Sequence, residues 1–185
     1  MGILRCVDGS ELRVVPVACR DREGTPYEVT LDLERDGTPY GAVGERCGWF
    51  LARVGHLLEE ARADESSWPD PDDRFPCSRD GELFEFRYRE RVDVPVAGEF
   101  RCHVRSDSAW EKATGWRLHR RAFVEAWGST GTAVRAVLTS TELAEFLAEL
   151  VADAEQELGT SYGESVRLGQ PPISADGVPI RLGAG

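Results

Sequence analysis

The fold is decided by residues 116–158, which read WRLHRRAFVEAWGSTGTAVRAVLTSTELAEFLAELVADAEQEL. Residues 116–127 are rich in aromatic and branched side chains, which favour β-strands. The Gly-Ser-Thr-Gly segment at 128–131 indicates a turn, because glycine adopts positive φ angles without a steric cost. Apolar residues then alternate along 134–138, which is typical of a strand with one buried face. This stretch therefore predicts two strands joined by a turn.

A long amphipathic helix is predicted to follow. Thr139 and Glu142 have the spacing of a capping box, which marks the start of a helix. Apolar residues then recur at intervals that place them on one face of a helix, and they are Leu143, Phe146, Leu147, Leu150, Val151, Ala154 and Leu158. Gly159 is expected to end the helix, because glycine readily adopts the left-handed C-cap conformation.

The rest of the chain adds further strands and another helix. Alternating apolar and polar side chains predict strands at residues 11–19, 27–35, 82–91 and 99–106. An apolar stripe predicts a helix over 44–63, whose glycines favour close packing against the sheet. The expected order is ββαββββα. This order indicates an α+β fold, with a single antiparallel sheet of about six strands and two amphipathic helices packed on one face.

Length and composition indicate one folded domain. A chain of 185 residues with 41% hydrophobic residues, five Trp and seven Phe is long and apolar enough to bury a core. We place this domain at residues 1–158. Residues 159–185 are rich in Gly and Pro and are expected to form an extended segment packed on the domain.

The net charge restricts the classes of partner, and the apolar runs and cysteines indicate the cellular compartment. A net charge of −11 disfavours nucleic acid and anionic membranes as partners. The sequence has no apolar run of about 20 residues and no basic-then-apolar start, so we expect a cytoplasmic protein. The five scattered cysteines are interpreted as reduced thiols. The 21 arginines beside one lysine indicate the coding bias of a GC-rich, bacterial genome.

The strand alternation predicts a cationic outer face on the sheet. The side chains expected to point inward are Phe84, Phe86, Tyr88, Phe100, Cys102, Val104, Trp116 and Leu118. The opposite face then presents Arg87, Arg89, Arg101, His103, Arg105, Arg117, His119 and Arg121. Guanidinium pairs on such a face could bind a carboxylate, a phosphate or an acidic partner. The alternative is a solvated face with cross-strand ion pairs, each of which contributes little stability.

Three segments are predicted to lack regular structure. Residues 36–39 and 107–115 are expected to be a break and a polar loop. The longest irregular segment is 64–81, in which Trp68 and Phe75 are the large apolar residues. A loop of this length is often a lid or a binding loop, and the alternatives are an anchored surface loop and disorder.

The sequence contains no spacing typical of a catalytic or metal site. Cys102 and His103 are adjacent on a strand and therefore face opposite sides, and no C-x-x-C or H-x-x-x-H is present. We therefore predict no catalytic residues, no metal and no cofactor. An enzyme stays open, since acid–base pairs assembled by folding leave no linear pattern.

A non-catalytic, cytoplasmic protein-binding module, such as a regulatory or immunity-type partner, is the function that the sequence favours. The expected partner is another protein or a second copy of the chain, with a small anionic ligand as an alternative partner. The alternative function is a small-molecule-binding protein or an enzyme of helix-grip type, with its pocket between the sheet and the C-terminal helix. That comparison rests on the order of elements alone.

Overall fold

The computed structural model describes residues 2–45, 47–62, 75–76, 80–87, 98–128, 131–159 and 161. The first antiparallel sheet contains β1 (Gly2–Arg5), β2 (Glu11–Arg20), β3 (Pro26–Arg35) and β4 (Thr38–Glu45), paired in that order. The second contains β5 (Gly81–Arg87), β6 (Glu99–Glu111), β7 (Gly115–Trp127) and β8 (Ala133–Leu138), also paired in chain order. Helix α1 (Cys47–Arg62) follows the first sheet, and α2 (Ser140–Leu158) follows the second.

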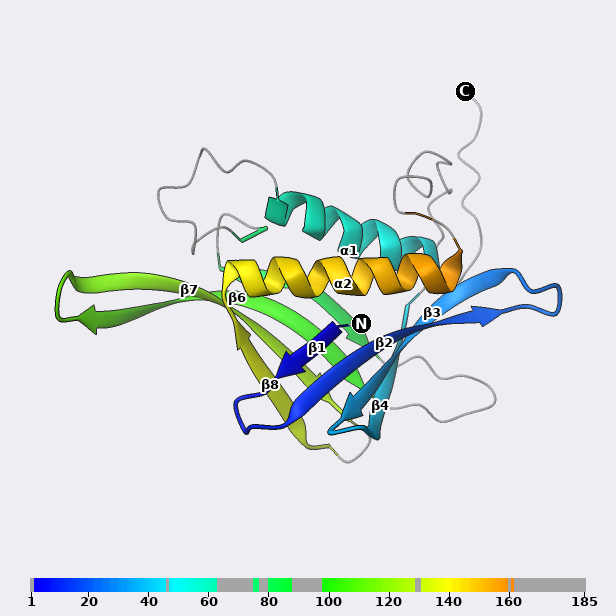
Figure 1. Ribbon diagram of the computed structural model, residues 1–185, viewed down its shortest axis with the longest axis horizontal. Helices are drawn as coiled ribbons and strands as arrows, with labels where there is room; N and C mark the ends of the chain where they lie inside the picture. Colours follow the sequence, from blue (N-terminus) through cyan, green and yellow to red (C-terminus); the bar gives the residue numbers. More distant parts are fainter. Residues whose placement is uncertain are drawn as a thin grey trace, which may run out of the picture.

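The described chain thus has the order ββββαββββα, in which a four-stranded meander followed by a helix occurs twice. The two helices lie side by side across the sheets, and the central hairpins, β2–β3 and β6–β7, project at opposite ends of the molecule (Figure 1). The α+β class and the two helices are as expected. The expected single sheet of about six strands is corrected: the described residues form two sheets of four strands each.

The additional strands have physical explanations. Asp36 and Gly37 have φ angles of 50° and 73°, as the two central residues of a tight type I′ hairpin require, so the expected break at 36–39 is the turn between β3 and β4. Because β4 then continues to Glu45, helix α1 begins at Cys47 rather than at residue 44. Strand β1 reads Gly-Ile-Leu-Arg, in which apolar and polar residues do not alternate, so the pattern does not indicate a strand.

The prediction of a polar loop at 107–115 is wrong, because β6 and β7 pair continuously from Glu99↔Trp127 to Glu111↔Gly115. In the described chain, β5 pairs with β6 up to Val104 and β8 pairs with β7 from Ala122. Residues 105–121 therefore form a two-stranded extension beyond both neighbouring strands, which we call the ribbon. The ribbon lies on the left in Figure 1.

Helix α2 agrees with its sequence signals. Thr139 and Glu142 form the capping box, and Gly159 adopts the left-handed conformation with φ 68°. All of the expected apolar face is buried, namely Leu143, Phe146, Leu147, Leu150, Val151, Ala154 and Leu158. The helix packs on β1 and β2 of the first sheet as well as on β7 and β8 of the second. It therefore joins the two halves.

A single apolar core fills the space between the helices and the sheets. The residues expected to face inward from β5 and β6 are buried, namely Phe84, Phe86, Phe100, Cys102 and Val104. Phe100 lies at the centre of an aromatic cluster, with ring centroids 5.3 Å from Phe84, 6.5 Å from Phe86 and 6.3 Å from Phe146. The expectation that Trp116 and Leu118 are inward is wrong, because both lie on the ribbon, where no core lies beneath them. Tyr88 falls outside the described residues.

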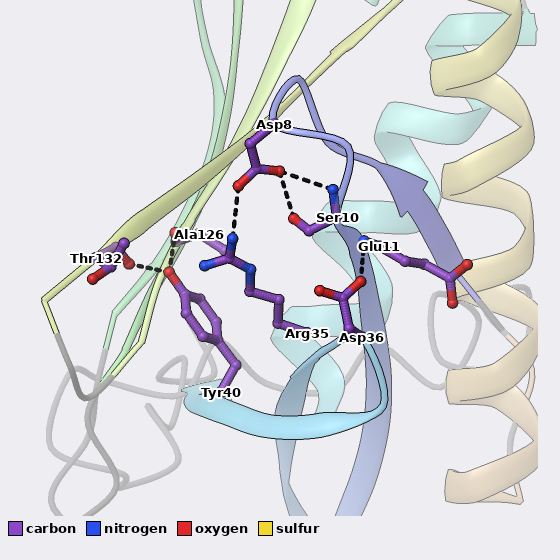
Figure 2. A network of polar contacts seen from close by, with 8 residues as sticks. All are labelled: Asp8, Ser10, Glu11, Arg35, Asp36, Tyr40, Ala126 and Thr132. Atoms are coloured by element: carbon purple, nitrogen blue, oxygen red, sulfur yellow. Dashed lines mark hydrogen bonds and ion pairs between the residues drawn. The ribbon is translucent and has the colours of Figure 1, made fainter.

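The two sheets meet at a polar junction (Figure 2). The Tyr40 hydroxyl of β4 donates to the carbonyl oxygens of Ala126, at 3.4 Å, and of Thr132. The Asp8 carboxylate accepts hydrogen bonds from the Ser10 hydroxyl at 2.6 Å and from the Arg35 guanidinium at 2.8 Å. These contacts hold the β1–β2 and β3–β4 turns together beside the end of β7.

Backbone contacts complete this junction. The Val7 amide in the β1–β2 turn donates to the carbonyl oxygen of Arg135 in β8 at 2.7 Å. At the other edge, β4 passes so close to the second sheet that a Cβ on Gly98 would lie 2.7 Å from the Ala42 carbonyl oxygen. Glycine is therefore required where the two sheets approach each other.

Candidate functional site

The outer face of the second sheet contains a compact charged cluster around Glu125. This carboxylate is only 3% exposed, and it accepts hydrogen bonds from Arg101 Nε at 2.8 Å and Arg135 Nε at 2.7 Å. Arg101 also lies 4.4 Å over the Trp127 ring and 3.6 Å from a Glu99 oxygen. Among the arginines of the expected cationic face, Arg101 is thus held by partners within the sheet.

His103 lies beside this cluster. Its ring stacks on Phe123 with centroids 5.3 Å apart and planes 9° from parallel. Burial lowers the pKa of His103, and the neighbouring Arg105 lowers it further, which outweighs the attraction of Glu125. The lowered pKa favours the neutral form of His103, and its ring packs on Phe123 of the outer face.

Glu125 makes the stability of the protein depend on pH. Burial acts to raise the pKa of Glu125, but the hydrogen bonds from Arg101 and Arg135 outweigh burial and lower it. A carboxyl with a lowered folded-state pKa contributes stability above its unfolded pKa of about 4.3, and that contribution is lost as the pH falls through the folded value.

Replacing this carboxyl tests the cluster. Because the two arginines are partly exposed, we expect Glu125→Gln to lower the free energy of unfolding at pH 7 by only about 1–2 kcal/mol. Urea denaturation at several pH values should show a shallower loss of stability between about pH 5 and 3 than in the wild type. Glu23→Gln, at an exposed position of the turn between β2 and β3, is the control, and an equal change in both variants would contradict this role of Glu125.

The ribbon brings together the remaining described members of the expected cationic face. Cross-strand pairing puts Arg105 opposite Arg121 and Asp107 opposite His119, with Arg117 two residues further along the same face. Glu111 lies 3.0 Å from His119 Nε2 and 3.7 Å from Arg117 Nε. With five Lys/Arg and two Asp/Glu, residues 105–121 carry a net charge of +3, so the rest of the chain carries −14. The expected two-sided charge is therefore concentrated on the ribbon.

The opposite face of the ribbon is apolar and exposed. Trp110 and Trp116 are cross-strand partners in an edge-to-face arrangement, with centroids 5.8 Å apart and planes at 72°. Trp110 is 63% exposed, Trp116 70% and Leu118 62%. Sequence reasoning did not select these residues for a site, because it assigned Trp110 to a loop and the other two to the core. The alternation of Trp116 and Leu118 with Arg117 and His119 was the available signal.

The base of the ribbon is fixed to the domain. Asp80 accepts hydrogen bonds from the Ser106 amide at 2.8 Å and the Ser106 hydroxyl at 2.7 Å, and these bonds lower the pKa of Asp80. Arg120 is buried, 3.9 Å from Asp80 and 5.4 Å over the Phe75 ring. Phe75, one of the two large apolar residues of the expected loop at 64–81, is 4% exposed and packs against Arg120 at the base of the ribbon.

Three further expected site residues have no described side chain. Trp68 and Arg89 lie outside the described residues, and Arg87 lies in β5 with its side chain outside them. The predictions for these residues therefore stay predictions.

A pocket of about 220 Å³ lies on the surface between β1, β8 and α2. Its apolar lining includes Ile3 and Val137, which are 46% and 39% exposed, and the buried Phe146. The α2 side of the pocket is lined by acidic residues, which are Glu142, Glu145 and Glu149. The pocket thus has apolar lining residues and an acidic wall on the α2 side.

The described residues contain no group of three or more His, Cys, Asp or Glu that could hold a metal ion. Cys6, Cys19 and Cys102 are buried thiols outside any disulfide, and burial raises the pKa of Cys6. Neither of the two described helices has the length and apolar character needed to cross a bilayer.

No protein-family model, curated protein or solved structure matches this chain.

Proposed function

We propose that this protein is a protein-binding module and that the ribbon is its contact element. The observation that carries the proposal is the face formed by Trp110, Trp116 and Leu118, which are all more than 60% exposed on a projecting ribbon. Exposed clusters of large apolar residues mark interaction sites, and Trp is enriched among the residues that dominate binding energy.

The construction of the ribbon supports this proposal. An isolated two-stranded hairpin is only marginally stable in water, so a long projecting one needs an anchor. Asp80, Arg120 and Phe75 provide that anchor at its base. A fixed ribbon binds with a smaller loss of conformational entropy than a mobile one, which favours affinity.

The charge of the ribbon indicates the kind of partner. The face opposite the two tryptophans carries Arg105, Arg117 and Arg121, which favours an acidic protein surface around an apolar contact. Nucleic acid fits less well, because the rest of the chain carries a charge of −14 and would repel phosphates.

A ligand pocket between the second sheet and α2 has less support. Phe100 and Phe146 meet there with ring centroids 6.3 Å apart, and both are buried in the core. A binding site on the ribbon does not require that space to be empty.

Replacing one tryptophan tests the proposal. Removing a central Trp from an interface typically costs about 2 kcal/mol or more, so Trp116→Ser should weaken partner capture by about 30-fold. Capture of partner proteins from the native extract should be quantified at low and high salt for the wild type, Trp116→Ser and Val7→Ser. Val7→Ser, at another apolar residue that is 72% exposed, is the matched control and should capture normally.

Two results would contradict the proposal. One is equal capture by the wild type and Trp116→Ser. The other is binding of single-stranded oligonucleotides that is lost in Trp116→Ser and retained in Val7→Ser, because the ribbon would then be a nucleic-acid-binding element.

A further inference from the structure

We infer that the partner of the ribbon is a second copy of this chain, and that the pocket between β1, β8 and α2 receives its tip. This inference rests on the proposed function, since it takes the ribbon as the contact element. It adds the surface that the ribbon binds and the chemical reason for that choice.

The pocket matches an aromatic side chain in character and size. Ile3 and Val137 leave apolar surface exposed in its lining, and covering that surface gains free energy. A cavity of about 150 Å³ lined by apolar side chains accepts a benzene ring. The pocket of about 220 Å³ therefore has room for the larger indole of Trp116 or Trp110.

The charges of the two surfaces are complementary. Three glutamates and one arginine line the pocket, which gives it a net charge of −2, whereas the ribbon carries +3. Glu142 is engaged in the capping box of α2, and Glu145 is an exposed acid of the pocket lining that an incoming partner can meet. Arg105, Arg117 and Arg121 project from the ribbon face opposite Trp116, so their charge favours the approach of the ribbon to the acidic wall without a direct contact beside the inserted ring.

The two surfaces cannot meet within one molecule. The ribbon projects away from β1 and α2, and its tip lies at the left edge of the view, whereas the N-terminus and β1 lie near the centre (Figure 1). Since every copy carries one ribbon and one pocket, the contact is head-to-tail between different surfaces. It closes into a two-fold dimer when the two contacts are reciprocal, and otherwise it extends into a chain of copies.

Sedimentation velocity of the purified full chain, over a range of concentrations at low and high salt, measures this association. Trp116→Ser removes the inserted group, and Glu145→Lys reverses a charge on the pocket wall. We expect each variant to weaken self-association by at least about tenfold. Gln156→Lys, at an exposed position near the other end of α2, is the matched control and should associate like the wild type.

Mixing the two variants tests the head-to-tail arrangement directly. An equimolar mixture should form 1:1 complexes, because the intact ribbon of Glu145→Lys meets the intact pocket of Trp116→Ser. Thermal unfolding followed by circular dichroism should show that both variants are folded, so that loss of association is not loss of structure.

Other outcomes separate this inference from the proposed function. Association that survives Glu145→Lys but not Trp116→Ser would overturn the pocket as the acceptor and keep the ribbon as the contact element. A wild-type chain that stays monomeric at all concentrations would overturn the inference, while capture of a different protein through Trp116 would still support the proposed function. Association that survives both substitutions would overturn the inference and count against the ribbon.

Discussion

Phe100→Ala is expected to lower the free energy of unfolding by about 3–5 kcal/mol, a large part of the 5–15 kcal/mol by which a typical domain is stable. The ring is fully buried and contacts aromatic rings from both sides, those of Phe84 and Phe86 in β5 and that of Phe146 in α2. Alanine would remove the transfer free energy of the ring and leave a cavity that these neighbours fill only in part.

Urea denaturation with the slope of the transition fitted freely measures this loss. Phe123→Ala is the control, because Phe123 lies one strand away on the outer face, where it is partly exposed and stacks on His103. It should cost about 1–2 kcal/mol, since less apolar area leaves the interior. An equal cost for the two variants would mean that the aromatic cluster is not the centre of the core.

Gly128→Ala should destabilise the protein by about 3 kcal/mol or more, although it adds a single methyl group. A Cβ on Gly128 would overlap the backbone carbonyl oxygen of Tyr40, which cannot move as a flexible side chain can. The substitution must therefore displace β4 from the end of β7. That displacement would also break the hydrogen bonds of the Tyr40 hydroxyl to the carbonyl oxygens of Ala126 and Thr132.

The matched control is Gly81→Ala in β5. A Cβ on Gly81 would meet nothing within 4 Å, and its φ angle does not require glycine. Thermal unfolding should show a melting temperature for Gly81→Ala equal to or slightly above that of the wild type, because alanine restricts the unfolded chain. A melting temperature for Gly128→Ala within a degree or two of that control would contradict the close junction of the sheets.

The sequence was most informative where one residue pattern has one structural solution. Thr139 and Glu142 predicted the start of α2, and Gly159 predicted its end, because caps depend on local hydrogen bonds and on a left-handed glycine. The alternation in β6 and β8 likewise predicted which side chains are buried. These signals act over a few residues and do not depend on the partner element.

The division into two sheets could not be predicted in the same way. It depends on which strands are neighbours, and β4 pairs with β3 but only packs against β5 and β6. The Asp36–Gly37 turn was a readable hairpin signal, which the following Pro39 and glycines obscured. The close approach that makes Gly128 necessary leaves no trace in its own neighbourhood of the sequence.

The apolar face of the ribbon escaped prediction for a related reason. The alternation along Trp116 and Leu118 gave the correct side of the strand, but the period alone cannot say whether a core lies on that side. The pairing with β5 and β8 stops at Val104 of β6 and Ala122 of β7, so the same face that is buried in the sheet becomes exposed on the ribbon. The pocket likewise combines β1, β8 and α2, which are distant in sequence.

Helix α2, near the C-terminal end of the described chain, covers β1 and β2 from the N-terminal end, and this has a consequence for biosynthesis. Leu12 and Val14 belong to the same core as Leu147 and Leu150 of α2, and the Arg20 guanidinium donates to the last turn of that helix at the Glu157 carbonyl. During translation the amino-terminal meander emerges long before its covering helix. The apolar side of this meander therefore stays uncovered until α2 has been synthesised, and in that interval a chaperone or the rest of the nascent chain has to shield it.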